Sequence, residues 1–365
     1  MSKLSTVSIS IQRQLFPALE DEIGELSDKE RKFVRIIELI EIGRFLVGHG
    51  WCGVGRKPHS RQGLAKAFVA KAVWNITTTR ALIDLIRTSP SLRRLCGWDT
   101  VADIPDESAF SRAFALFSQM ELPQRIHEAL VNEHLGEKLC GHISRDSTAI
   151  KGREKPKPKD KPETKKKAKK RGRPRKGEKR EKKPPRRLEL QPARSLEDNL
   201  ADLPAFCNVG CKKNSKGYKE TWIGYKLHLD VIDGDIPISG ILTAASLHDS
   251  QVSIPLAQMS AERVTSLYDL MDAAYDAKEI HDFSRSLGHV PIIDDNPGRG
   301  KEKLQMAPAE KMRFKERSSA ERVNSNLKDN YGGNHVRVRG TQKVACHLMF
   351  GLLALTATQL FNLLL

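Results

Sequence analysis

The chain of 365 residues is longer than a single typical core requires, so two domains are expected. Its formal net charge of +17 favours a polyanionic partner, either nucleic acid or an anionic membrane surface, but residues 151–187 hold 21 Lys and Arg against 5 Asp and Glu and leave the rest nearly neutral. Six widely spaced cysteines exclude a dense disulfide scaffold and favour a reducing compartment, and the amino-terminal stretch lacks the continuous apolar core of a secretory signal.

Residues 1–138 are expected to form a helical, DNA-binding amino-terminal domain. Apolar residues recur at spacings of three and four in "RKFVRIIELIEIGRFLV" and in "LAKAFVAKAVWNITTTRALIDLI", which is the period of a helix with one buried face. Asp106 precedes "ESAFSRAF" and is predicted to be its N-cap. A compact unit of this kind could hold a helix-turn-helix reader of DNA, although helical packing alone explains the same pattern.

Residues 139–365 are expected to form a sheet domain. "GHISRDSTAI" has the pattern of a strand, "GYKLHLDVIDGDIPISGILTA" predicts a hairpin that turns at Asp233 and Gly234, and "VTSLYDLMDAAYDAKEI" predicts a strand and then a helix. "PIIDD" predicts another strand. From Met312 onward the pattern predicts a helix, a short strand in "HVRVRG" and an apolar terminal helix. This order indicates an α/β (α+β) fold.

A basic insertion at residues 151–217 interrupts this domain after its first strand. The insertion is expected to be disordered, with order resuming near Tyr218, because its part from Lys151 to Arg187 has almost no apolar residues and cannot offset the entropy of ordering. Within it "RGRPRK", which contains Arg171 and Arg173, matches the core of an AT-hook, whose arginines enter a narrow A·T-rich minor groove. Binding to any DNA through counterion release is the alternative.

The terminal run "VACHLMFGLLALTATQLFNLLL" is about long enough to span a bilayer. Its polar residues, which include His347, Gln359 and Asn362, and the lack of other such runs favour a buried core helix over a membrane anchor. No membrane partner is therefore expected.

Three carboxylates stand out by position. Asp146 ends the first predicted strand, Asp272 ends a later one, and Glu321 lies in a predicted helix. Carboxylates gathered from distant segments suit hard divalent cations, because Mg²⁺ prefers a few carboxylate oxygens and keeps its other positions for water and phosphate. A strand-end Asp is also a common turn residue, and a helical Glu is usually solvated. The competing aspartates are Asp249, Asp269 and Asp276.

The helix around Glu321 carries a polar stripe. Arg317 and Glu321 are four residues apart and Lys328 follows after seven more, so all three share one face, together with Asn324 and, one turn earlier, Phe314. An intrahelical Arg–Glu pair on a wet surface is one reading. A metal-bound Glu flanked by two cations that hold a DNA phosphate is the other.

At these residues the chain resembles the DDE-type transposases of bacterial insertion sequences. Many of them carry a helix signature of Tyr, two residues, Arg, three, Glu, six, Lys, and this chain matches it at Arg317, Glu321 and Lys328, with Phe314 in the tyrosine position. The flanks "RDST", "ASLHDSQ", "DAAYD" and "YGGNHVRVRG" are also similar, as is the helical stretch "SPSLRRLCGWDTVADIPDESAFSRAF". The resemblance covers about two-thirds of the chain and omits the first fifty residues or so and the basic insertion.

The resemblance implies a DNA transposase with an RNase H-like catalytic domain. Asp146, Asp272 and Glu321 would hold two Mg²⁺ ions, for which Mn²⁺ substitutes, and Arg317, Lys328 and Phe314 would contact transposon-end DNA. Asp272 is preferred to Asp269 because it stands at the strand exit before the "AAYD" turn. The implied reaction is cleavage at the element's end and joining of the freed 3′-hydroxyl to target DNA, by a homodimer on double-stranded DNA in the bacterial cytoplasm, at the nucleoid.

Two further motifs are weaker. Cys207 and Cys211 lack the matching second pair of a zinc site. "NPGRGKEKL" lacks the first glycine and the Ser or Thr after lysine of a phosphate-binding loop, so no ATP requirement is expected. The alternative function is a catalytically degenerate or architectural protein that coats A·T-rich DNA through the basic insertion.

Overall fold

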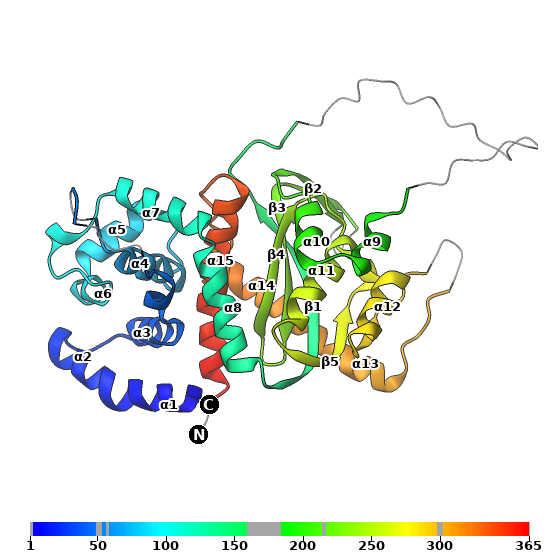
Figure 1. Ribbon diagram of the computed structural model, residues 1–365, viewed down its shortest axis with the longest axis horizontal. Helices are drawn as coiled ribbons and strands as arrows, with labels where there is room; N and C mark the ends of the chain where they lie inside the picture. The colour runs from blue at the N-terminus through cyan, green and yellow to red at the C-terminus, as the bar shows by residue number, and fades with distance from the viewer. Residues whose placement is uncertain are drawn as a thin grey trace, which may run out of the picture.

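The computed structural model describes residues 3–48, 53–55, 58–158, 184–213, 217–297 and 302–364. Figure 1 shows a helical part and a part built on a twisted sheet, with the terminal helix α15 (Thr341–Asn362) standing between them. The expected combination of an amino-terminal helical region with an α/β sheet region is confirmed.

The amino-terminal part is helical throughout its described residues, as predicted. Its α-helices are α1 (Lys3–Ser10), α2 (Phe16–Ile23), α3 (Asp28–Ile40), α4 (Arg61–Val73), α5 (Thr79–Thr88), α6 (Pro90–Leu95), α7 (Glu107–Gln119) and α8 (Leu122–Leu135). Local signals start several of them. Ser27 and Glu30 form a capping box at α3, and the predicted N-cap Asp106 accepts a hydrogen bond from the backbone N–H of Ala109 at 2.7 Å.

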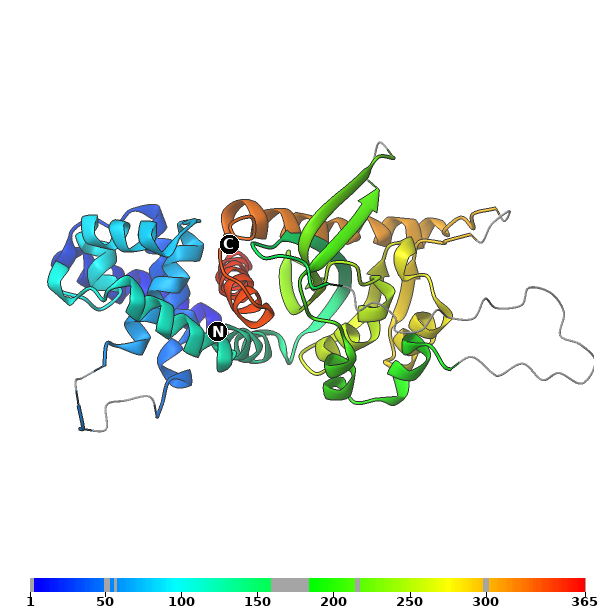
Figure 2. The same cartoon turned by 90° about the horizontal axis from the view of Figure 1, so that it is seen from above.

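The second part contains a six-stranded mixed sheet. Its strands are β1 (Leu139–Lys151), β2 (Asn208–Lys213), β3 (Lys219–Ile232), β4 (Ile236–Ala244), β5 (Thr265–Met271) and β6 (Val290–Ile293). The central strand β1 pairs antiparallel with β3 and parallel with β5, and β5 pairs parallel with β6. The long strand β3 pairs with β2 along its first half and with β4 along its second. Figure 2 shows the green β2–β3 ribbon projecting beyond the body of the molecule.

The predicted hairpin is present between β3 and β4. Gly234 and Asp235 both have positive φ, at 82° and 57°, which is the backbone twist that matches a tight hairpin. Arg322 then ties this turn to a helix through two short contacts with the Asp235 carboxylate, at 2.7 and 2.9 Å.

Helices cover both faces of the sheet. On one face α11 (Ser250–Ala261) packs on β3 and β4, and α12 (Lys278–Ser286) packs beside it. On the other face α14 (Ser318–Asn330) packs on β1 and β3, preceded by α13 (Pro308–Phe314) and the short helix η6 (Lys315–Arg317). Successive residues of β1 therefore face different helices, because side chains alternate along a strand.

The terminal helix α15 joins the two parts of the molecule. It contacts β4 on the sheet side and α3, α4, α7 and α8 on the helical side. Its surface is apolar all round, and 83% of its most apolar window is buried. Among the described residues, α15 is the one helix that is long enough and apolar enough to cross a membrane. Its burial agrees with the prediction of a core helix.

Two expectations about the carboxyl-terminal half were wrong in detail. The insertion is not structureless over all of 151–217, because α9 (Arg187–Leu190), α10 (Leu196–Asp202) and β2 lie within it and α9 and α10 pack on α11. Residues 159–183, with the AT-hook match at Arg171 and Arg173, lie outside the described residues. The predicted strand "HVRVRG" forms no strand, since the N–H of Gly340 donates to the side chain of Glu154 and not to a neighbouring strand.

Candidate active site

Two of the three predicted carboxylates meet where the parallel pairing of β1 with β5 ends, although Asp146 lies within β1 and not at its end as predicted. In the parallel pairing of β1 with β5, Ser144 stands opposite Leu270. Continuing this register by two residues brings Asp146 level with Asp272, which directly follows β5 and caps the short helix η5 (Ala273–Tyr275). The side chain of Asp272 is held by the backbone N–H of Ala274, at 2.9 Å.

Asp146 is half-buried beside other carboxylates. Burial, and then the nearby carboxylates of Asp272 and Glu321, raise its pKa to about 6, although a hydrogen bond from the backbone of Ser147 and the charge of Arg317 act in the opposite direction. Its oxygen Oδ2 accepts a hydrogen bond from Nδ2 of Asn324 on α14, at 3.0 Å. A half-buried carboxylate with a raised pKa and carboxylate neighbours is a candidate for a functional site.

Asp272 has acidic neighbours of its own. Burial raises its pKa, and the carboxylates of Asp249 and Asp294 raise it further, against the backbone hydrogen bond from Ala274 and the charge of Arg317. Asp249 begins α11 and is paired with Lys226 at 2.8 Å. Asp294 follows β6, the next parallel strand, so it lies at the same edge of the sheet. The predicted strand "PIIDD" contains Asp294, so its place at the end of a strand could be read from the sequence. The sequence did not show that this strand pairs with β5 and so brings Asp294 close to Asp272.

The polar stripe contains an ion pair between Arg317, the last residue of η6, and Glu321 on α14. This pair lies near the two aspartates. Arg317 and Glu321 contact each other at 2.5 Å, with 21% and 54% of their side chains exposed. The guanidinium of Arg317 also lies 5.6 Å from the ring centroid of Phe314, a cation–π contact. Arg317 lowers the pKa of both Asp146 and Asp272 by its charge. The structure therefore shows the intrahelical ion pair and places it near the aspartates, while the metal-binding role of Glu321 stays a prediction.

Lys328 lies at the other end of the stripe in a basic cluster. Burial lowers its pKa, and the charges of Lys212 on β2 and Lys151 at the end of β1 lower it further, while Asp329 and Asp146 raise it. We call these three lysines the basic cluster. Lys328 lies near Asp146, whereas Lys151 follows Asp146 by five residues along β1, roughly 17 Å in an extended strand. Mutually repelling lysines beside buried carboxylates suit a bound polyanion.

Two buried oxygen atoms around the aspartates have no partner within the described structure. They are the side-chain oxygen Oδ1 of Asn324 and the hydroxyl of Tyr275. The pKa of Tyr275 is raised by burial and then by the charges of Asp249, Asp146 and Asp272, so this hydroxyl lies close to all three. Unpaired buried polar atoms are costly unless water or an ion completes them.

The donor set fits a hydrated divalent cation. Asp146 and Asp272 offer carboxylate oxygens, and the unpartnered Asn324 and Tyr275 oxygens could accept or hold coordinated water. Within the described parts of the chain no group of three His, Cys, Asp or Glu is close enough to form a ready-made metal site. The predicted set of Asp146, Asp272 and Glu321 is therefore not assembled in the described structure, where Glu321 is paired with Arg317. One or two carboxylates, together with water and substrate phosphates, can hold Mg²⁺.

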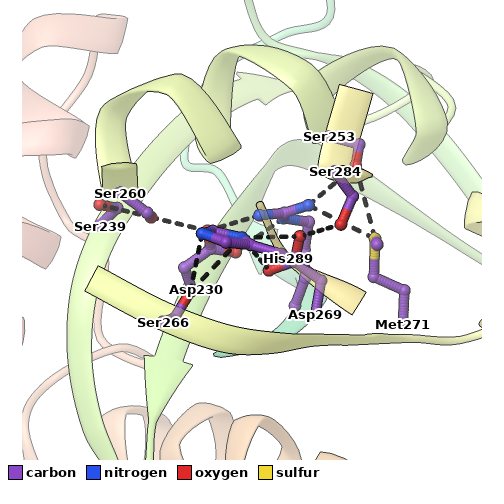
Figure 3. Close-up of polar contacts among 10 residues, drawn as sticks. Asp230, Ser239, Ser253, Ser260, Ser266, Asp269, Met271, Ser284 and His289 are labelled. Carbon is purple, nitrogen blue, oxygen red and sulfur yellow. Dashed lines mark hydrogen bonds and ion pairs between the residues drawn. The ribbon is translucent and has the colours of Figure 1, made fainter. Parts of the chain in front are cut away.

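The competing aspartates have structural partners. Asp269 is 1% exposed and accepts hydrogen bonds from Ser284 at 2.5 Å and His289 at 3.2 Å, as Figure 3 shows. Burial alone would raise its pKa, but the hydrogen bond from His289 and the charge of Arg145 hold it below the ordinary value. Asp276 contacts His281 at 3.1 Å and accepts from the backbone of Asn296. Neither is among the charges that act on Asp146.

A buried ion pair supports the site from the opposite face of β1. Arg145 makes a two-pronged contact with Asp230 on β3, with both N···O distances at 2.7 Å, and donates to Ser253 at 3.0 Å. Asp230 also accepts from Ser260, which reaches Ser239 (Figure 3). Because Arg145 and Asp146 alternate along the strand, the pair fixes β1 on the α11 side while Asp146 faces α14.

Two family models match this chain. One is described as "Transposase domain (DUF772)" and matches residues 18–116, and the other as "Transposase DDE domain" and matches residues 207–357. The chain belongs to the DDE transposases of insertion sequences. The comparison with curated proteins found no match.

The matched regions agree with the structure of the transposase. The first covers most of the helical part, and the second begins just before β2 and includes Asp272, Phe314, Arg317, Glu321 and Lys328. Asp146 lies before the second match, on the central strand that its sheet requires. A DDE domain implies an RNase H-like fold, which confirms the expected fold of the sheet part. Cys207 and Cys211 are free thiols.

Proposed function

We propose that the transposase cuts the ends of its element and joins the freed 3′-hydroxyl to target DNA at a site formed by Asp146, Asp272 and Glu321. The observation that supports this most is the meeting of Asp146, within β1, and Asp272, just after β5, where the parallel pairing of these strands ends, with the pKa of both raised. DDE transposases generally depend on divalent metal ions, so Mg²⁺ is the proposed cofactor and Mn²⁺ its substitute.

The proposed roles follow from the surroundings of each side chain. Asp146 and Asp272 would hold the cation, and Glu321 would join them from α14 after parting from Arg317. Mg²⁺ bound there supplies activation of the attacking hydroxyl and stabilisation of the leaving oxygen. Arg317 would then be free to bind a phosphate oxygen, with Phe314 holding its guanidinium plane from the other side.

The positive groups around the site would position the DNA. The basic cluster, of which Lys328 lies near Asp146, would bind the backbone of the cleaved strand. The helical part, residues 1–138, is proposed to bind the transposon ends, and Arg171 and Arg173 to bind A·T-rich DNA. A homodimer acting on two ends, without ATP, in the cytoplasm is part of the proposal.

A cleavage assay tests the assignment. Duplexes that carry the ends of the element are incubated with the protein and Mg²⁺, and nicked products are resolved on a gel. Asp146→Asn, Asp272→Asn and Glu321→Gln should each abolish cleavage while DNA binding persists. Asp282→Asn, an exposed acid on α12, should cleave normally. Retained cleavage by the first three variants would show that the site is elsewhere, and absent cleavage by the wild type with intact DNA binding would favour the architectural alternative.

A further inference from the structure

A cavity of about 410 Å³ lies at the seam between the helical part and the sheet part, away from the carboxylates. Helices α4, α5 and α7 form one wall, and the chain after β1, the 337–339 segment and α15 form the other. Its lining residues are Phe68, Lys71, Thr79, Glu107, Phe110, Ser111, Phe114, Arg153, Arg337, Val338, Arg339 and Lys343. The volume falls within the range of roughly 300–1,000 Å³ that is typical of ligand sites.

The charge of this cavity is strongly one-sided. Five of its lining side chains are cationic and only Glu107 is acidic. Glu107 is already paired with Arg80, at 3.4 Å. None of the five cations forms an ion pair with another described residue. Such a surplus of unpaired positive charge lowers the free energy of a bound anion and has no evident role in packing.

Lys71 is the unusual member of the set. Its side chain is only 7% exposed, it lines the cavity from α4, and no hydrogen bond or ion pair to a described residue holds its ammonium group. Burial lowers its pKa to about 8. A buried, unpaired lysine is costly in a folded protein unless something pairs with it. The cost would be offset by an anion inside the cavity.

The arginines indicate what kind of anion fits. Arg337 and Arg339 are exposed at the mouth, while Lys71 lies at the floor, so positive charge extends from solvent to the interior. Arginine binds phosphate oxygens through paired N–H groups. Positive charge that extends from the exposed arginines to the buried Lys71 suits one phosphate of a longer chain that passes over the mouth of the cavity. It suits a compact ligand, enclosed on all sides, less well.

The position of the cavity matches a duplex that also reaches the carboxylates. Arg153 follows Asp146 by seven residues, nearly all of them in β1, and this stretch spans roughly 23 Å when extended. That is roughly the length of seven base pairs of duplex DNA. A duplex that lies along β1 with its end at Asp146 would thus pass the cavity about seven base pairs from that end.

We propose that this cavity binds a backbone phosphate of DNA, with Lys71 as the buried cation and Arg337 at the entrance. The site deepens the proposed function and rests on it, because it would anchor the helical part and the sheet part to the same duplex. Both walls must keep their spacing for the phosphate to be held. The anchor is distinct from the basic cluster beside Asp146.

The test measures binding of a short fluorescent duplex to the full chain by anisotropy between about 50 and 200 mM KCl. Lys71→Met should weaken binding about tenfold near physiological salt. It should also reduce the slope of log K against log salt by about 1, as expected for one lost phosphate contact. Arg337→Ala, at an exposed position, should lower the slope by a similar amount.

Lys66→Met is the matched control. Lys66 lies on the same helix α4 but lines other surfaces of the molecule, so its replacement removes the same charge without touching the cavity. An equal loss of slope in this control would mean that net charge alone is responsible and would overturn the proposal. So would unchanged binding by both Lys71→Met and Arg337→Ala.

Thermal denaturation with inorganic phosphate separates a DNA phosphate from a free anion. Lys71→Met removes an unpaired buried charge, so the variant should melt no lower than the wild type. If phosphate stabilises the wild type but not Lys71→Met, while duplex binding is unchanged, the cavity serves a free anion and the DNA assignment is wrong. If Lys71→Met does not fold, Arg337→Ala decides. Loss of cleavage in Asp146→Asn is independent of these results, so failure here leaves the proposed function standing.

Discussion

Replacing Asp146 by asparagine should stabilise the metal-free protein at neutral pH although it removes a proposed catalytic group. Burial and neighbouring carboxylates raise the pKa of Asp146 from 3.8 to about 6. An acid whose pKa is higher in the folded state makes the folded state less stable as the pH rises through that window, because the folded state must release a proton that the unfolded state has already lost. A shift of this size corresponds to about 3 kcal/mol at pH 7.5.

Asparagine keeps the shape and the acceptor oxygen for Asn324 but carries no charge. The variant should therefore melt about 6 °C above the wild type in EDTA at pH 7.5, at roughly 2 °C per kcal/mol for a large domain. Near pH 4 the difference should vanish, because Asp146 is then protonated in the folded wild type. Asp282→Asn, on the exposed side of α12, should leave the melting temperature unchanged at both pH values.

Mg²⁺ should remove most of this difference. A cation at 100 times its dissociation constant stabilises the folded wild type by about 2.7 kcal/mol, which nearly closes the gap, and the variant should gain little. Differential scanning fluorimetry with EDTA or MgCl₂ measures all four conditions. The reasoning would be refuted by a variant that melts below the wild type in EDTA at pH 7.5, or by the same gap at pH 4, since neither result can come from ionisation of Asp146.

Substitutions at three other places test the packing of the fold and the ring contact with Arg317. Arg145→Met should destabilise the fold by about 3–5 kcal/mol in a denaturant titration, because it strands the buried Asp230 carboxylate, whereas the double variant Arg145→Met, Asp230→Leu should recover most of that loss. Gly351→Ala should lower the melting temperature although Ala favours helices, because its Cβ would stand 2.4 Å from the backbone oxygen of Tyr331. Phe314→Leu should reduce end cleavage several-fold through loss of the ring contact with Arg317, and Phe314→Tyr should restore it.

The elements that carry the proposed site could be predicted because their signals are local. The strand that ends just before Asp272 was predicted, and helical spacing places Arg317, Glu321 and Lys328 on one stripe, although Arg317 belongs to η6 and the other two to α14. The prediction that a strand ends at Asp146 was wrong, because β1 continues to Lys151 in its pairing with β3. Parallel strand ends meet at one edge of a sheet, so the approach of the two aspartates followed once the fold class was expected. The hairpin at Asp233 and Gly234 was equally readable from its turn residues.

Partners that come from distant segments could not be read in this way. "HVRVRG" alternates like a strand, but a strand forms only where the edge of another strand is free to pair. Arg339 and Gly340 instead donate hydrogen bonds to Arg153 and Glu154, in the chain after β1. Arg145 and Asp146 are neighbours in sequence with opposite surroundings, which only the sheet reveals. The cavity around Lys71 joins α4 with the segment before α15, more than two hundred residues later, so no sequence pattern could show it.

The charges at the sheet edge also explain why DNA and metal should bind together. The carboxylates of Asp272 and Glu321 raise the pKa of Asp146, and those of Asp249 and Asp294 raise the pKa of Asp272. Among the described residues, the cations that offset this charge include Arg317, Lys226 and Lys303. A phosphate adds negative charge to this surface, so its approach is unfavourable until cations arrive. The basic cluster and the Lys71 cavity can hold the rest of the backbone without metal. We therefore expect Mg²⁺ to tighten binding of a duplex whose end reaches Asp146, and to have little effect on Asp146→Asn, as anisotropy with and without MgCl₂ would measure.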